Sequence, residues 1–220
     1  MKHLFVNGCS FNRPRKKDGH SVQTYVGRIV AQHYGAKEHI FARGGRGNRR
    51  VCDTTKLFYE TNKILKHNSV AIIQWTSAGR RDYPTNDGYK PIEGYNTTWR
   101  SWGTHEQLKF IHSLQGFDID QDHSLMQLND IIDLQNYFKI HGIKYVMYFG
   151  LISQINLKYK DHKTLHESID WSKFYQPNTS HYEFCATNKL QISKNDQHPN
   201  LQGHEKWAQG LIKYIDNEII

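Results

Sequence analysis

The stretch FVNGCSFNR, residues 5–13, joins a short apolar run to a glycine and a serine. The run at residues 4–6 is typical of a buried β-strand, and Gly8 permits a sharp backbone turn that other residues resist. Ser10 therefore follows the tip of a predicted strand. Because α/β sheets place their chemistry at strand tips, Ser10 is the first candidate functional residue.

The rest of the chain alternates between strand-like and helix-like apolar patterns. Strands are predicted at 38–42 (EHIFA), 69–75 (SVAIIQW) and 143–149 (IKYVMYF), and helices over 22–35, 51–65, 125–138 and from Asn200 onward. Parallel strands need crossover connections, which helices usually supply. The order therefore predicts one domain over residues 1–220, a three-layer α/β/α sandwich with a parallel, flavodoxin-like sheet.

The segment 80–122 interrupts this alternation. It is rich in aromatic residues, namely Tyr83, Tyr89, Tyr95, Trp99 and Trp102. A segment of this length inside a compact domain is usually a lid or a binding element. Two interpretations stay open: a lid over the active edge, or a satellite hairpin with its own aromatic core. The irregular span 153–195 is expected to pack near the same edge.

Charge is distributed unevenly along the chain. The protein carries 29 Lys and Arg against 21 Asp and Glu, a formal net charge of +8. Residues 1–50 hold 11 of these basic residues and 2 of the acidic ones, so this quarter accounts for the whole positive excess. The excess is either an ordinary solvated surface or a field that attracts polyanions such as acidic glycans or nucleic acid.

Several functional classes are not indicated. The three cysteines are widely spaced without a CxxC pair, and the 14 histidines show no metal-ligand spacing, so we expect no metal and no cofactor. No apolar run approaches the roughly 18 residues of a membrane-spanning helix, so no membrane partner is expected. The first residues are too short an apolar stretch for a signal peptide, which favours a cytoplasmic location. Association with a virion and the oligomeric state stay open.

Four polar stretches are expected to meet at the carboxyl edge of the sheet. They are the turn at Ser10, ARGGRGN (42–48), QWTSAGR (74–80) and NDQHPN (195–200). A serine hydroxyl is a weak nucleophile until an imidazole accepts its proton, and a carboxylate that orients the imidazole completes the arrangement. Asp196 and His198 supply these two groups in the last stretch.

These stretches resemble the sequence blocks of a known family. NGCSF, ARGGRGN and DQHPNLQGHEKWA are similar, in this order, to the first, second and last blocks of the SGNH, or GDSL-type, hydrolases. In particular, the sequence is similar to a divergent branch often found in tailed-phage genomes. It implies the SGNH hydrolase fold, with Ser10 as nucleophile and His198 as base, oriented by Asp196. It also implies that the backbone N–H groups of Ser10 and Gly45 contribute to an oxyanion hole.

Two departures from the family pattern matter. The third family block, Gly-x-Asn-Asp, corresponds here to residues 74–77, Gln-Trp-Thr-Ser, so the usual oxyanion asparagine is missing. Thr76 and Asn48 are the candidates to replace it. The family aspartate usually lies three residues before the histidine, where this chain has Asn195, whereas Asp196 lies two before.

The function implied by the resemblance is hydrolysis of an ester through an acyl-enzyme on Ser10. A small acyl group such as acetyl is expected, on a small molecule or an anionic glycan that Arg46 and Arg80 would bind. For Arg80, pairing with an acidic neighbour such as Asp82 is an equal alternative. One alternative is a catalytically weak module with the same fold that binds a polyanion. Another is a phosphodiester or thioester hydrolase that uses the same serine.

Overall fold

A four-stranded parallel sheet forms the centre of the structure. The computed structural model describes residues 1–17, 20–80, 83–85, 88–90, 119–153, 155 and 157–220. In spatial order, the strands of the central sheet are β4 (Lys37–Ile40), β1 (His3–Asn7), β5 (Ser69–Trp75) and β8 (Lys144–Phe149). Phe5 of β1 pairs with His39 on one side and with Ala71 on the other. This arrangement confirms the predicted parallel sheet of flavodoxin-like order.

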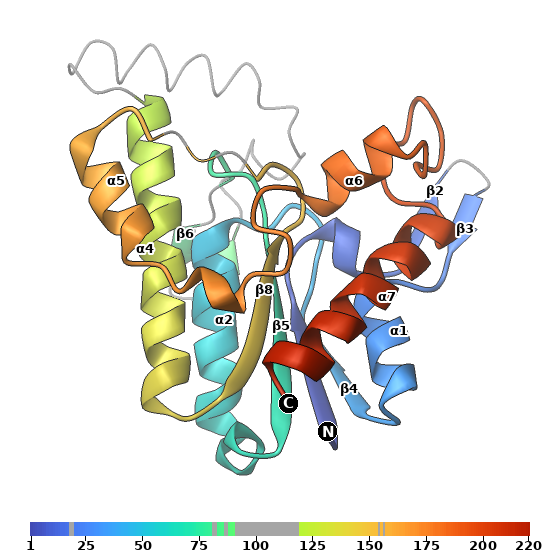
Figure 1. Ribbon diagram of the computed structural model, residues 1–220, viewed down its shortest axis with the longest axis horizontal. Helices are drawn as coiled ribbons and strands as arrows, with labels where there is room; N and C mark the ends of the chain where they lie inside the picture. The colour runs from blue at the N-terminus through green and yellow to red at the C-terminus, as the bar shows by residue number, and fades with distance from the viewer. Residues whose placement is uncertain (18–19, 81–82, 86–87, 91–118, 154, 156) are drawn as a thin grey trace.

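Helices cover both faces of the sheet (Figure 1). One face carries α1 (Val26–His33) and α7 (Leu201–Glu218), and the other carries α2 (Asn48–Thr61) and α4 (Ile119–Ile140). Side chains alternate along a strand, so Leu4 and Val6 pack into the core under α1 and α7, while Phe5 packs under α2 and α4. Every residue of β5 is buried. A strand covered on both faces explains the apolar run SVAIIQW.

Shorter elements complete the described chain. They are η1 (Ser10–Asn12), β2 (Arg15–Lys17), β3 (His20–Val22), η2 (Lys63–Lys66), β6 (Tyr83–Thr85), β7 (Gly88–Lys90), α5 (Lys160–Glu167), η3 (Trp171–Lys173) and α6 (His181–Thr187). None of the helices in the described ranges combines the length and apolar character needed to cross a membrane.

The sequence-based assignment of elements was wrong in several places. The first helix begins at Val26 rather than near residue 22, because residues 20–22 pair with β2 in an antiparallel ribbon. The span 153–195 is not irregular, since it contains α5, η3 and α6. The start of α6 is marked by a capping box, in which Ser180 and Glu183 each bond the other's backbone N–H. That Ser-x-x-Glu pattern was a readable signal.

The aromatic-rich insertion is described only in part. β6 and β7 pair antiparallel over Tyr83–Lys90, as the satellite-hairpin interpretation predicts for these residues. The helix expected from residue 125 begins earlier, at Ile119, within the segment assigned to the insertion. Tyr95, Trp99 and Trp102 lie outside the described residues, so the choice between lid and satellite stays a prediction.

Candidate active site

Ser10, His198 and Asp196 form one hydrogen-bonded chain. The Ser10 Oγ atom lies 2.8 Å from Nε2 of His198, and His198 Nδ1 lies 2.7 Å from Oδ1 of Asp196. An ionised carboxylate only accepts hydrogen bonds, so Nδ1 carries the ring proton and Nε2 is left to accept the serine proton. The His198 side chain is 20% exposed and that of Asp196 is 5% exposed. This geometry allows an imidazole at the surface to take a proton from a hydroxyl.

The loop before α7 explains how Asp196, only two residues before His198, reaches the imidazole. Asp196 and Ser193 bond each other, since the Asp196 N–H donates to Ser193 Oγ and the Ser193 N–H donates to the Asp196 carbonyl, both at 3.0 Å. The folded loop lets Asp196 Oδ1 accept from the backbone N–H of His198 at 3.2 Å as well as from its ring. Asn195, at the usual family position of the carboxylate, is exposed. The carboxylate that reaches His198 is therefore Asp196.

The turn that presents Ser10 is built against Gln74. Gly8 has φ +148°, and a Cβ atom there would lie 2.6 Å from the Gln74 Cβ. Gln74 is fully buried, and its Oε1 lies 3.2 Å from the Cys9 backbone nitrogen and 3.1 Å from the Cys9 sulfur, accepting from both. Its Nε2 donates to the hydroxyl of Tyr148 at 3.3 Å. This role was not predicted, although an amide within the buried run VAIIQW was a signal.

Asn48 and Thr76, the two candidates for the missing oxyanion donor, lie together. Asn48 Nδ2 donates to the Thr76 carbonyl at 3.3 Å, and its Oδ1 accepts from the Thr76 N–H at 2.9 Å. Gln127 donates to the same carbonyl. The hydroxyl of Thr76 is fully buried and has no hydrogen-bond partner within the described structure. Buried hydroxyls are normally paired, so this unpaired one is an exception.

The glycine loop passes beside Ser10. A Cβ atom on Gly44 would lie 3.8 Å from the Ser10 Cβ, and the Arg43 N–H donates to the Gly8 carbonyl at 3.1 Å. Gly45 has φ +77°, and a Cβ there would meet no atom within 4 Å. The loop therefore leaves open space at Gly45, and its predicted role in an oxyanion hole stays a prediction.

The two arginines predicted to bind substrate occupy different surroundings. Arg46 is 5% exposed, and its guanidinium donates to Asn7 Oδ1 at 3.1 Å. The same oxygen accepts from the Gly8 N–H at 2.9 Å, so Arg46 braces the turn from behind. Arg80 is partly exposed, and its backbone N–H donates to the Ser77 carbonyl at 3.1 Å.

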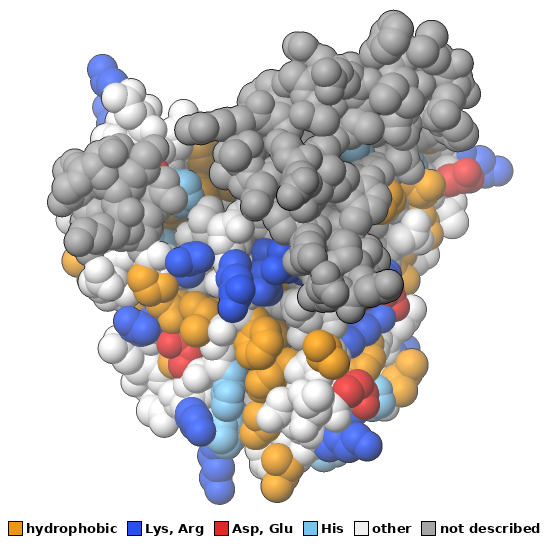
Figure 2. Space-filling view, turned by 180° about the vertical axis from the view of Figure 1, so that it is seen from behind, with side chains coloured by type: hydrophobic (Ala, Val, Ile, Leu, Met, Phe, Trp, Pro, Cys, Tyr) orange, Lys and Arg blue, Asp and Glu red, His pale blue; other side chains and the backbone are white. Residues whose placement is uncertain are grey.

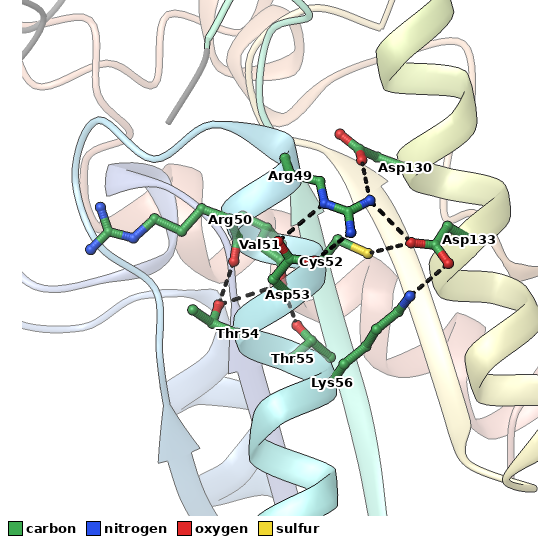
Figure 3. Close-up of polar contacts among 10 residues, drawn as sticks. All are labelled: Arg49, Arg50, Val51, Cys52, Asp53, Thr54, Thr55, Lys56, Asp130 and Asp133. Carbon is green, nitrogen blue, oxygen red and sulfur yellow. Dashed lines mark hydrogen bonds and ion pairs between the residues drawn. The ribbon is translucent and has the colours of Figure 1, made fainter. Parts of the chain in front are cut away.

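A charged network joins α2 to α4 (Figure 3). Arg49 Nη1 lies 3.6 Å from Asp130 and 3.3 Å from Asp133, and Lys56 Nζ lies 2.6 Å from Asp133. Burial raises the pKa of Asp130 to about 7, although Arg49 opposes the shift. These carboxylates pair with cations, and in the described parts of the chain no three His, Cys, Asp or Glu side chains are grouped so as to hold a metal ion. The network anchors the helix that follows the glycine loop.

A separate cavity lies beyond the end of β8. Its volume is about 420 Å³, and its lining includes Trp171, His166 and Ser153. None of Ser10, Asp196 and His198 lines it.

Solved structures share this fold. The psychrotrophic esterase EstA from Pseudoalteromonas sp. superposes with a TM-score of 0.56 at 8% identity, over 98% of this chain and 97% of that chain. TesA gives a TM-score of 0.53 at 9% identity over 99% and 100% of the two chains. The acetyl xylan esterase Est2A from Butyrivibrio proteoclasticus gives 0.51 at 16% identity, over 98% of this chain and 63% of that chain.

No protein-family model and no curated protein sequence matches the chain. The likeness to solved structures, at these identities, establishes the fold alone. The chain has the three-layer α/β/α fold of the SGNH hydrolases, as the sequence analysis predicted.

Proposed function

We propose that this protein is an SGNH-type serine esterase of the divergent, tailed-phage-like branch, with Ser10 as nucleophile. The observation that carries the proposal is the unbroken hydrogen-bond chain from Ser10 Oγ through the imidazole of His198 to Asp196. Fold and sequence blocks agree with it, because the same three residues stand in the first and last blocks of the family pattern.

Acylation follows from this geometry. Ser10 Oγ attacks the ester carbonyl carbon while its proton passes to Nε2 of His198, and Asp196 stabilises the imidazolium that forms. The carbonyl π electrons move onto oxygen. When the tetrahedral intermediate collapses, the bond to the leaving alcohol breaks and His198 returns the proton to that alcohol. Water then attacks the acyl-enzyme with His198 again as base, releasing the acid and restoring the Ser10 hydroxyl.

The oxyanion needs donors that are in place before the reaction. We assign the backbone N–H groups of Ser10 and Gly45, and the hydroxyl of Thr76 in place of the family asparagine. The buried, unpartnered state of that hydroxyl supports the assignment. The amide of Asn48 already bonds the Thr76 backbone, so we assign Asn48 the holding of Thr76 rather than direct donation.

The substrate we propose is a small acyl ester, with acetyl the first choice, on a small molecule or an anionic glycan. A structural neighbour is named an acetyl xylan esterase, which supports this choice. Arg43 is exposed beside Gly44, and Arg80 lies on the loop after Thr76. The exposed Arg43 is suited to an anionic carrier, whereas Arg46 supports the turn through Asn7.

A polyanion-binding module with weak catalysis is the second candidate. The observation that favours it is the concentration of positive charge in residues 1–50. Lys and Arg side chains also gather near the middle of the face shown in Figure 2. Nucleic acid or an acidic glycan is the partner that this alternative implies.

A substrate panel separates the candidates. Acetyl, butyryl and octanoyl esters of 4-nitrophenol, an acetyl thioester and a phosphodiester are offered to the protein and to its Ser10→Ala variant. The proposal predicts Ser10-dependent hydrolysis, fastest on the acetyl ester and nearly unchanged between about 50 and 200 mM salt. Binding of a polyanion that weakens steeply over that range, without Ser10-dependent turnover, would favour the module instead.

A further inference from the structure

The ring of Phe11 lies against the imidazole of His198. The two ring centroids are 4.7 Å apart, with an angle of 35° between the ring planes. Phe11 directly follows Ser10 and is 3% exposed. The imidazole is thus held at Nδ1 by Asp196, at Nε2 by Ser10 and on its face by Phe11.

Phe11 is itself held from behind by α6. Its ring meets His181 edge-on at 5.9 Å and Tyr182 at 6.3 Å between centroids. α6 is fixed to the end of β8, because the Tyr182 N–H donates to the Gly150 carbonyl at 3.1 Å. Ser180 Oγ donates to the Leu151 carbonyl at 2.7 Å. A ring packed on both sides cannot turn away without moving this helix.

We propose that Phe11 is a positioning residue that holds the His198 imidazole between Ser10 and Asp196 and stabilises its protonated form through the ring face. An aromatic ring has a negative face that attracts a cation within about 6 Å of its centroid. The proposal rests on the proposed function in one respect: protonated His198 is the form that acylation creates.

The other ionisable groups described around Phe11 and His198 do not oppose the stabilisation of protonated His198. Asp196 contacts the imidazole directly and stabilises the same charge. His181 contacts the Phe11 ring, and His204 lies 5.4 Å from His181 between ring centroids. Burial keeps the pKa of His181 well below its ordinary value, and burial together with His198 lowers the pKa of His204 to about 3. Both are neutral at physiological pH, so neither repels an imidazolium at His198.

The test replaces Phe11 with 4-fluoro-, 3,5-difluoro- and 3,4,5-trifluorophenylalanine. These analogues nearly keep the volume of the ring and weaken its negative face step by step. The pKa of His198 is measured in the folded protein from its ring proton NMR shifts, and kcat and KM are measured on an acetyl ester. The same analogues at Phe174, which is 2% exposed and packs against Phe149 and Trp171, are the matched control.

The expected result is a stepwise fall in the His198 pKa, about half a unit over the series. A fall in kcat of about threefold should accompany it with KM unchanged, and the Phe174 series should change neither. A His198 pKa that is constant over the Phe11 series would overturn the proposal. The NMR measurement needs no turnover, so a shifting pKa in a protein without hydrolase activity would contradict the proposed function and leave the role of Phe11 standing.

Discussion

Ser10 Oγ lies 2.8 Å from Nε2 of His198, although 188 positions separate the two residues in the chain. The first strand and the loop before the last helix are brought together at one edge of the sheet, and the carboxylate of Asp196 reaches the other ring nitrogen. Because this contact joins distant parts of the chain, it depends on the residues that hold the two segments in place. Each of these residues can be changed and the effect on activity or stability measured.

Asp196 should be the carboxylate that orients His198. The change Asp196→Asn leaves an amide that no longer favours the useful tautomer, and we expect kcat to fall by about 10³- to 10⁴-fold with little loss of stability. The matched control is Asn195→Ala, one residue earlier at the usual family position. Steady-state kinetics decides: equal losses in the two variants would contradict the assignment.

Thr76 should supply part of the oxyanion hole. Thr76→Val removes the unpartnered hydroxyl and keeps the shape of the side chain, so we expect kcat to fall by about 10²-fold while thermal stability is kept. Thr76→Ser should retain most of the activity. A valine variant with unchanged kcat would show that the hydroxyl does not contact the reacting oxygen.

Gln74 should hold the turn that presents Ser10. Gln74→Met leaves the Cys9 N–H without its acceptor in a buried site, and we expect a loss of about 1–3 kcal/mol in the free energy of unfolding, with a lower kcat. Cys9→Ala removes only the thiol contact and should cost less activity. Urea denaturation and kinetics on both variants measure the two effects. Full activity in Gln74→Met would contradict this role.

Gly8 should tolerate no side chain. Gly8→Ala combines a positive φ with a Cβ placed 2.6 Å from the Gln74 Cβ, so we expect a loss of about 2–5 kcal/mol in the free energy of unfolding. Gly35→Ala is the control, because Gly35 has φ +59° but open space around its Cβ position, and about 1 kcal/mol is expected there. Equal losses in the free energy of unfolding for the two variants would contradict the claim that close packing against Gln74 excludes a side chain at Gly8.

Asp130 should make stability depend on pH. The pKa of Asp130 is about 7 in the folded state, above that of an exposed aspartate. Its contribution to the free energy of unfolding is therefore fully present below about pH 4 and is lost as pH rises through 7. Asp130→Asn should therefore gain stability relative to the parent protein as pH rises, by up to about 4 kcal/mol.

Asp133→Asn should show the opposite sign. Burial raises the pKa of Asp133, but the hydrogen bond and charge of Lys56, together with contacts from Cys52 and Arg49, outweigh burial and lower the pKa. Asp133 therefore stabilises the folded protein at pH values above the pKa that it has in the unfolded chain. This stabilisation is lost as pH falls through its lower folded-state pKa. Urea denaturation at acidic and at mildly basic pH checks both variants. A stability difference for Asp130→Asn that does not change with pH would contradict the shift.

The fold and the three central residues of the site were readable from the sequence because their signals are local. SVAIIQW and IKYVMYF are apolar runs typical of buried strands, and NGCSF and DQHPN stand in the order of the first and last family blocks, although Asp196 lies one residue closer to His198 than the family aspartate does. The spacing alone did not decide whether the Asp196 carboxylate reaches His198. The folded loop, in which Asp196 bonds Ser193, decides which side chain meets the imidazole.

The supporting residues could not be assigned because their roles depend on tertiary contacts. Gln74 is a neighbour of Gly8 and Cys9 only after two strands pair. Phe11 meets His198 and α6 only when three distant segments converge. The short ribbon β2–β3 was missed because neither of its three-residue strands is long enough to display a periodicity.

The most direct measurement is labelling of the folded protein with a fluorophosphonate, followed by mass spectrometry of the modified peptide. A structure of the neighbour EstA is described as inhibited by monoethylphosphonate, a related organophosphorus compound. The account predicts one label on Ser10, absent in Ser10→Ala and strongly reduced in His198→Ala. A folded protein that takes no label at Ser10, or takes it equally well without His198, would contradict the central claim.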